Sequence, residues 1–251
     1  MSCNERKNTL YITIKDALKR QIRTGELSAG DRIMSEAEIC AAFGVSRISA
    51  KHALDDLVKE GYISRIQGKG SFVTYTPIEH MVMGLYNFND EMRKHDLAPS
   101  TKVLEFREIR IGDLSNEDIK FELKNHMYLE DHDTVYYIRR LRYANGNLIF
   151  LDNSYLSTRF CPSIQPEDLT NYEDLDALMQ NKFRLNVTRG QEFLFAGAVN
   201  AEEADLLGVN IGSPALKVMR INYAMGNPVE FDYRISRGET YRYRIDLQKR
   251  Q

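Results

Sequence analysis

The sequence predicts an α+β protein with two domains, for three reasons. The chain has 251 residues, which is enough for two domains of ordinary size. Residues 8–75 carry helical patterns followed by one short hairpin, whereas residues 87–248 are mainly alternating strand patterns with a few helices. Within the second part, two stretches repeat each other at an offset of 80 residues, which predicts related hairpins in one antiparallel sheet with helices outside it. We expect a linker over residues 76–86.

Composition excludes several classes of protein. The chain is 43% hydrophobic and 28% charged, as is typical of soluble globular proteins. Its apolar runs are far shorter than the roughly 20 residues of a membrane helix, and residues 1–30 lack the pattern of a signal peptide. The three cysteines are widely spaced, which argues against a disulfide framework or a zinc site. We therefore expect a cytoplasmic protein without a metal, another cofactor or a membrane partner.

The charges are unevenly distributed along the chain. Residues 1–76 hold 12 Lys and Arg against 9 Asp and Glu, whereas the remainder holds 22 against 27. A mildly basic head (residues 8–75) on an acidic body (residues 87–248) is what a DNA-binding domain joined to a ligand-binding domain would show.

The head begins with three predicted helices. The first spans residues 10–24 and ends before Gly25, because apolar residues recur there at every fourth position. The second begins after Ser35, which forms a capping box with Glu38, and ends at Gly44. The third follows Ser46 and stops at Gly61. Its predicted inner face holds Ile48, Ala53, Leu54, Leu57 and Val58.

The second and third helices have the order and spacing of a helix-turn-helix. In that motif the N-terminal part of the second member contacts base edges in the major groove. The outward positions there are Arg47, Ser49, Lys51 and His52. Arg47 could donate two hydrogen bonds to a guanine, whereas Ser49 and Lys51 suit phosphates better. For His52 an ordinary surface role is the alternative.

A basic hairpin follows the third helix. Two short strands over residues 62–66 and 71–75 are joined by a turn at residues 67–70, as in the wing of a winged helix-turn-helix. Gly68 and Gly70 allow close approach of the backbone to a phosphate or minor groove, with Lys69 at the tip. The alternative for the whole head is a helical hairpin with a solvated basic face. The predicted DNA-binding residues are Ser35, Arg47, Ser49, Lys51, His52, Gly68, Lys69 and Gly70.

The head resembles the winged helix of GntR-type transcription regulators. Their pattern is Pro-Ser-Glu-Arg-Glu-Leu, then Gly-Val-Ser-Arg-x-Thr-Val-Arg-x-Ala-Leu, then Gly-Arg-Gly-Thr-Phe-Val. This chain has Met34 for the proline, Ala37 for the first arginine, Ala50 for the valine and Lys51 for the last arginine of the second stretch. The family arginine at position 37 usually contacts DNA, so the resemblance implies a variant operator or greater reliance on Arg47.

The body contains the internal repeat. Residues 140–147 with Asp152 match residues 220–227 with Asp232, and each copy predicts a strand, a turn and a return strand. A strand is also expected over residues 103–111. Helices are expected over residues 88–94, 116–121, 172–181 and 201–207.

The body resembles the UTRA ligand-sensing domain of the HutC-like branch of those regulators, whose fold is that of chorismate lyase. The resemblance rests on residues 87–92, on residues 140–146 with 152–156, on Tyr172 and on residues 226–230. It implies a chorismate-lyase-like antiparallel sheet with flanking helices. It also implies that the matching residues hold a small effector, often a sugar phosphate.

Two arginines point to an anionic ligand. Arg140 and Arg142 are two apart on a strand and therefore share a face. Two adjacent guanidiniums repel each other unless an anion lies between them, and they suit phosphate or carboxylate oxygens. The helix start near Asn87 and Phe88 could add N–H donors. The alternative is that both arginines lie on the surface of an edge strand. The predicted effector-binding residues are Asn87, Phe88, Arg140, Arg142, Asp152, Ser154, Tyr172 and Glu230, and for Asp152, Ser154 and Glu230 a role unrelated to ligand stays equally open.

The turn at Asn145 and Gly146 offers a geometric check. A two-residue turn would pair Arg142 with Ile149 and place Asp152 on the opposite face. A three-residue turn with a bulged glycine would pair Arg142 with Leu148 and bring Asp152 to the arginine face. If the anion site is real, we predict the bulged turn.

Together these features predict a ligand-responsive transcription regulator, a repressor rather than an activator and not an enzyme. We expect a homodimer on a palindromic double-stranded operator, with a small anionic effector that shifts the population between two states. Three alternatives stay open. The effector could be a non-phosphorylated amino acid derivative or fatty acid, the body could serve only to dimerise, or it could be a chorismate-lyase-type enzyme fused to a DNA module, although no catalytic constellation is visible.

Overall fold

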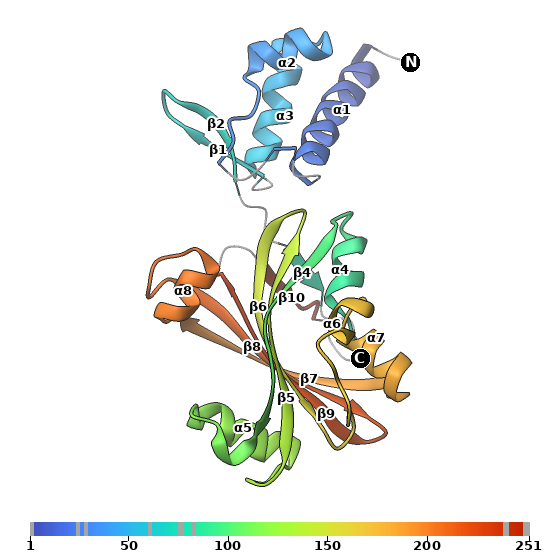
Figure 1. The fold of residues 1–251 in the computed structure, drawn as a ribbon. Coiled ribbons are helices and arrows are strands. Elements are labelled where there is room, and N and C mark those ends of the chain that lie inside the picture. The colour runs from blue at the N-terminus through green and yellow to red at the C-terminus, as the bar shows by residue number, and fades with distance from the viewer. Residues whose placement is uncertain are drawn as a thin grey trace. The chain divides into compact units, whose positions relative to one another are not determined.

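The computed structural model describes residues 3–23, 26–27, 30–59, 62–74, 78–81, 84–237 and 241–247 (Figure 1). The chain forms two compact units, Met1–Ile78 with His95–Leu97 and Glu79–Lys94 with Ala98–Gln251. The predicted ends at Gly25, Gly61 and Tyr75 and the linker residues 76–77 lie outside the described residues. Across the described parts, none of the helices combines the length and the apolar character needed to traverse a lipid bilayer.

The first unit is a winged helix-turn-helix. Its elements are α1 (Cys3–Arg23), α2 (Glu36–Phe43), α3 (Arg47–Lys59), β1 (Ile63–Ile66) and β2 (Gly70–Val73). The predicted capping box is confirmed, since the Ser35 side chain accepts from the Glu38 backbone N–H and Glu38 accepts from that of Ser35. Gly44 ends α2 at φ 64°, which glycine adopts without strain.

The inner face of α3 differs from the prediction at two positions. Ala53, Leu54 and Leu57 are buried as expected, but Ile48 is 73% exposed and Val58 is also exposed. Ala50 takes the inward position instead and is fully buried. The reason is the helical period of 3.6 residues, which places position 50, not 48, in line with 53, 54 and 57.

The wing turn is one residue shorter than expected. Gly70 already pairs with Ile66 in the β1–β2 ladder, so the turn comprises residues 67–69. The Lys69 N–H donates to the Ile66 carbonyl at 3.0 Å. Gly68 and Gly70 both have positive φ, at 76° and 116°, which explains why glycine occupies them.

The second unit is built on a six-stranded antiparallel sheet. Its order is β4-β5-β6-β9-β8-β7. The strands are β4 (Pro99–Arg110), β5 (Thr134–Ala144), β6 (Asn147–Ser157), β7 (Val187–Ala198), β8 (Pro214–Ala224) and β9 (Asn227–Arg237). A separate two-stranded sheet joins β3 (Ile78–Met81) to β10 (Tyr241–Arg244).

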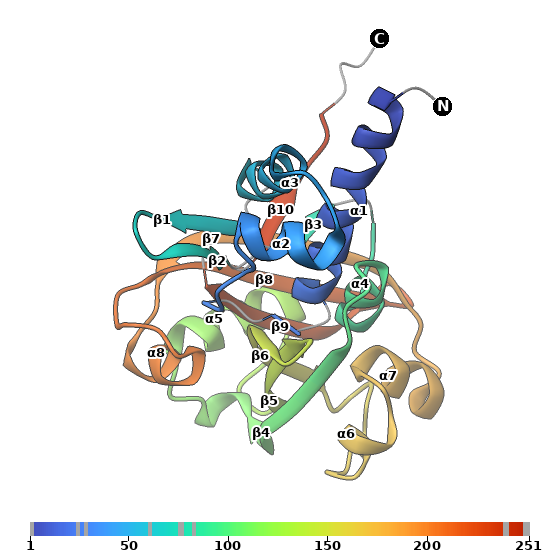
Figure 2. The ribbon, with the colours of Figure 1, turned by 90° about the horizontal axis from the view of Figure 1, so that it is seen from above.

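Helices cover both faces of the large sheet (Figures 1 and 2). On one side lie α5 (Glu117–Met127), after the short helix η1 (Ile111–Asp113), and α8 (Ala201–Leu207). On the other side lie α4 (Phe88–Lys94), α6 (Asp168–Asn171) and α7 (Leu175–Phe183). The predicted bounds of α4 and α8 are confirmed, whereas α5 is longer than expected and α7 begins three residues later.

The repeat in the sequence is a repeat in the fold. The units β4-β5-β6 and β7-β8-β9 join through β6 and β9 at the centre of the sheet. There Asn153 pairs with Tyr233, which is its counterpart in the repeat, 80 residues further along the chain. Asp152 pairs with Arg234, and Ser154 pairs with Asp232. This symmetric register places an approximate twofold axis between Asn153 and Tyr233.

Candidate functional site

A bulge beside each hairpin turn gathers polar residues on one face of the sheet. Asn145 and Gly146, with φ 48° and 76°, form a two-residue turn. Leu148 then pairs with Tyr143 and Phe150 with Arg142, so Ile149 is the extra, unpaired residue. The predicted three-residue turn and the Arg142–Leu148 pair are therefore wrong. The expected result still holds, because the bulge in the strand brings Asp152 opposite Arg140.

The second hairpin has the same two-residue turn and bulge. Met225 and Gly226 form the turn, with φ 49° and 78°, and Val229 is the extra residue. Asn222 consequently pairs with Glu230. Ile149 and Val229 are both buried, at 2% and 0% exposure, so each bulge is held by core packing.

Arg140 and Arg142 are buried side by side. They are only 6% and 4% exposed, and β5 lies between β4 and β6, so the alternative of surface arginines on an edge strand is wrong. Arg140 donates to the Ser154 hydroxyl at 2.8 Å, and Arg142 donates to the Asn89 side chain at 3.2 Å. Both share the Asp152 carboxylate at the longer distances of 3.6 and 4.0 Å.

Two further arginines complete a charged cluster that sequence reasoning did not assign to the site. Arg234 donates to Asp152 at 3.2 Å and to Asp232 at 3.1 Å. Arg220 lies 2.7 Å from Glu192. The repeat offset was the signal that could have found them, since Arg220 and Arg234 stand one offset after Arg140 and Ser154.

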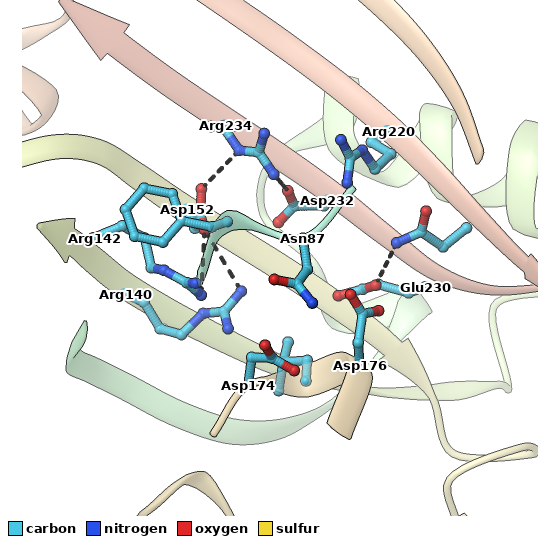
Figure 3. A pocket seen from close by; sticks show the side chains of 13 residues that line it. Asn87, Arg140, Arg142, Asp152, Asp174, Asp176, Arg220, Glu230, Asp232 and Arg234 are labelled. Carbon is cyan, nitrogen blue, oxygen red and sulfur yellow. Dashed lines mark hydrogen bonds and ion pairs between the residues drawn. The ribbon is translucent and has the colours of Figure 1, made fainter. Parts of the chain in front are cut away.

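These side chains line a small cavity (Figure 3). Its volume is about 40 Å³, and a neighbouring cavity of about 310 Å³ shares Asn87, Asp176, Arg220 and Asn222 with it. The charged lining residues of the small cavity are Arg140, Arg142, Arg220, Arg234, Asp152, Asp174, Asp176, Glu230 and Asp232. We call this small cavity the charged cavity.

The structure brings seven of the eight predicted effector residues to this region. Phe88 lies under the Arg142 guanidinium at 4.5 Å, and the Asn87 side chain caps α4 by accepting from the Asp90 N–H at 2.8 Å. Ser154 is fully buried and bridges Arg140 to Asp232. Tyr172 is the exception, because it packs against the apolar cluster beneath α6 and α7. Helix α7 begins at Leu175, so Asp174 and Asp176 reach the cavity in its place.

Burial and like charges shift several pKa values in the cavity. Burial, then the neighbouring Arg140, lowers the pKa of Arg142 to about 10. Burial, then Asp174, raises the pKa of Asp176 to about 6. Burial, then Asp232 and Asp176, raises the pKa of Glu230 to about 8. In each case burial disfavours the charged form, and a neighbouring like charge adds to the shift.

In the first unit, most predicted DNA-binding residues are exposed. The Arg47 side chain is 82% exposed at the start of α3, with Glu36 at 3.4 Å, and Lys51 and His52 are exposed further along. Ser49 was predicted to face outward, and this is wrong. Its N–H donates to the Ser46 hydroxyl at 3.2 Å, and the two hydroxyls are 3.0 Å apart, so Ser49 completes the buried cap of α3.

Comparison with known proteins identifies both units. Residues 10–73 match the bacterial regulatory proteins of the gntR family, and residues 94–242 match the UTRA domain. The chain is 26% identical to the HTH-type transcriptional repressor NagR of Bacillus subtilis over 93% of both chains. It is 23% identical to the mannosyl-D-glycerate transport/metabolism system repressor MngR of Escherichia coli over 95% of both.

The fold has the same relatives. The crystal structure of PhnF from Mycobacterium smegmatis superposes with a TM-score of 0.68 at 19% identity, covering 94% of this chain and 99% of that one. The winged helix-turn-helix, the six-stranded sheet and both family matches lead to one assignment. The chain belongs to the GntR family of DNA-binding transcription regulators, in the branch that carries a UTRA effector domain.

Proposed function

We propose that this protein is a repressor whose affinity for its operator is controlled by a small effector, and that the effector's anionic group binds at Arg140 and Arg142. The single observation that carries the effector site is the pair of buried guanidiniums, which share one carboxylate, Asp152, within 4.0 Å among the described residues. Guanidinium N–H groups directed at a common point suit phosphate or carboxylate oxygens. The sugar phosphate predicted from the sequence fits this end of the site.

The relatives support the repressor role. NagR and MngR both carry the word repressor in their names, and the name MngR refers to mannosyl-D-glycerate, a sugar joined to a carboxylic acid. We propose the same two roles here, with residues 8–75 binding DNA and residues 87–248 binding effector and dimerising. Of the expected linker over residues 76–86, residues 78–81 form strand β3 of the small sheet.

For the DNA-binding unit we propose contacts from α3 and the wing. Arg47, Lys51 and His52 are exposed along the N-terminal half of α3, where a helix-turn-helix meets base edges and phosphates. Lys69, between Gly68 and Gly70, is exposed at the tip of the wing. Ser35 at the N-cap of α2 is partly exposed and could contact a phosphate.

A homodimer on a palindromic operator completes the proposal. Each half-site of a palindrome takes one winged helix-turn-helix, so two copies are needed. Strand β7 lies at the end of the large sheet and exposes Leu194 and Phe195, at 43% and 46%. Apolar side chains on an end strand favour association with a second copy.

Operator binding by the full chain tests the proposal. We expect the protein to prefer DNA from its own promoter over random duplex at moderate salt, and to release it when effector is added. Arg140→Ala should weaken the effector response by about 10- to 100-fold, since it removes charge-assisted hydrogen bonds, and leave operator affinity nearly unchanged. Arg139→Ala is the matched control, because Arg139 points to the opposite face and pairs with Glu202. An unchanged response in Arg140→Ala would refute the anion site.

A further inference from the structure

The charges of the cavity are separated, with unbalanced positive charge at one end. Arg220 has Glu192 at 2.7 Å, and Arg234 has both Asp152 and Asp232 within 3.2 Å. In the described part of the chain, Arg140 and Arg142 share Asp152 as their one ion-pair partner, at 3.6 and 4.0 Å, and that carboxylate is already hydrogen-bonded to Arg234. Roughly one positive charge therefore stays unpaired at Arg140 and Arg142.

At the other end Asp176 lies beside Glu230, and Asp174 also lines the cavity (Figure 3). Within the described part of the chain, none of these three carboxylates forms an ion pair. Asp174 is engaged locally, because it caps α7 by accepting from the Ala177 N–H at 2.8 Å. Asp176 accepts no hydrogen bond from any described residue. Glu230 accepts one, from the Asn222 amide at 2.7 Å.

A buried acceptor without a donor lies at the same end. Asn222 is only 6% exposed and lines both cavities, and its side-chain oxygen has no hydrogen-bond partner among the described residues. Buried polar atoms are nearly always paired in a complete site. Among the described residues, Asp176 and the Asn222 oxygen thus have no protein donor and Glu230 has one, so this end of the cavity favours a ligand that donates hydrogen bonds.

We propose that the effector is dipolar, with its anionic group against Arg140 and Arg142 and a positively charged amine against Asp176 and Glu230. A purely anionic ligand would be repelled by the ionised Asp176, whereas an ammonium group supplies a positive charge and hydrogen-bond donors and favours ionisation of Glu230 as well. This inference rests on the proposed function and refines it, since it names the class of effector as an amine that also carries a phosphate or carboxylate. Burial, and then a neighbouring carboxyl, raises the pKa values of Asp176 and Glu230, and a cation bound beside them would oppose both shifts.

The geometry of the two cavities sets where the rest of the ligand lies. Asp176 and Asn222 line both of them, so the amine end stands at their junction. The anionic group fills the small charged cavity, and the remainder extends into the cavity of about 310 Å³. A sugar or short chain between the two charged groups would fit this path.

Matched pairs of small molecules test the inference on the full-length protein. One pair is phosphoethanolamine and ethyl phosphate, and the other is glucosamine 6-phosphate and glucose 6-phosphate. Calorimetric titration measures each affinity. In at least one pair we expect the amine-bearing member to bind at least tenfold more tightly. Asp176→Asn should remove this preference, whereas Asp205→Asn, which deletes an exposed carboxylate on α8, should keep it.

The outcomes separate this inference from the proposed function. Equal binding within both pairs, including no binding of either member, would overturn the dipolar effector. Survival of the preference in both Asp176→Asn and Glu230→Gln would also overturn it. If the amine-free compounds bind and Arg140→Ala abolishes their binding, the anion site stands and only the amine site falls. If Arg140→Ala leaves effector-induced release of DNA unchanged, the proposed function itself fails.

Discussion

Arg234 donates a hydrogen bond to the Tyr86 hydroxyl at 3.0 Å, and this bond joins the charged cavity to the small sheet of β3 and β10. Arg220 donates to the Tyr86 carbonyl at 2.9 Å, and the Tyr86 hydroxyl also lies 3.0 Å from that of Tyr243 on β10. On β3, the His80 ring lies 3.7 Å from the Tyr86 ring. Strand β3 is the first described element after the wing, so Tyr86 connects the cavity to the segment that follows the DNA-binding unit.

Tyr86→Phe should therefore weaken the communication between effector and DNA. The substitution keeps the ring contacts and removes the hydroxyl that Arg234 and Tyr243 share. We expect effector affinity to change less than threefold, and the effector-induced loss of operator affinity to shrink by about fivefold, which corresponds to about 1 kcal/mol of coupling. Operator titrations with and without effector measure this. Tyr128→Phe, at an exposed position that ends α5, is the control, and full coupling in Tyr86→Phe would contradict the connection.

Asp176→Asn should make the effector-free protein more stable at neutral pH. The folded-state pKa of Asp176 is raised to about 6, first by burial and then by Asp174, against an ordinary 3.8. Between pH values of about 3.8 and 6, the Asp176 carboxyl is deprotonated in the unfolded chain but still protonated in the folded chain. The free energy of unfolding therefore falls as pH rises through this range, and it stays low at higher pH. We expect a gain of about 1–3 kcal/mol at pH 7.5 and almost none near pH 4. Urea unfolding of both proteins at several pH values measures it, and an asparagine variant no more stable at pH 7.5 would contradict it.

Arg47 and Lys51 should contribute to DNA binding in different ways. Arg47→Ala should lower operator affinity by about 10- to 100-fold with less effect on random DNA, since a bidentate contact to guanine discriminates by about 1–3 kcal/mol. Lys51→Ala should weaken both kinds of DNA alike and reduce the salt slope by about one. Fluorescence anisotropy at several salt concentrations distinguishes these patterns. Lys59→Ala, at the far end of α3, should have little effect. Equal losses on operator and random DNA in Arg47→Ala would refute base contact.

Deletion of Ile149 tests the bulge that shapes the site. Without the extra residue, β5 and β6 can pair in a regular ladder, with Phe150 still opposite Arg142 and Asp152 still opposite Arg140. The deletion removes the buried Ile149 side chain and the local twist of the bulge, but it leaves Asp152 on the arginine face. We expect the variant to lose about 2–5 kcal/mol of stability in urea unfolding, and unchanged stability would contradict a structural role for the bulge. Replacement of Ile149 by valine, which keeps the bulge, should cost about 0.5–1.5 kcal/mol of stability only.

Local sequence signals predicted much of this fold. The capping box at Ser35, the bounds of α4 and α8 and the paired hairpins follow from short-range patterns, and the structure has them. Ser49 and Ile48 were placed on the wrong faces of α3, because the side on which the helix packs depends on α1 and α2 rather than on its own residues. Similarly, core packing of Ile149 decides the bulge, and no turn rule contains that information.

The acidic end of the cavity is the part that the sequence could not predict. Arg140 and Arg142 share one strand, so their common face is a local property. Asp176, on α7, meets Glu230, on β9, through tertiary packing alone. The prediction placed Tyr172 at the site because that residue matches the pattern of the UTRA domain, and it separately set the helix start three residues too early. The cap at Asp174 was the signal that could have corrected it, since an aspartate at this position starts a helix.

The approximate twofold axis between Asn153 and Tyr233 affects the orientation in which a ligand can bind. If the two halves of the site were identical, a ligand could bind in either of two opposite orientations with the same affinity. Here Arg142 corresponds to Asn222, and Ser154 corresponds to Arg234, so the two halves differ in charge. A ligand with chemically different ends is therefore expected to bind in one orientation, because the two copies of the repeat have diverged in charge.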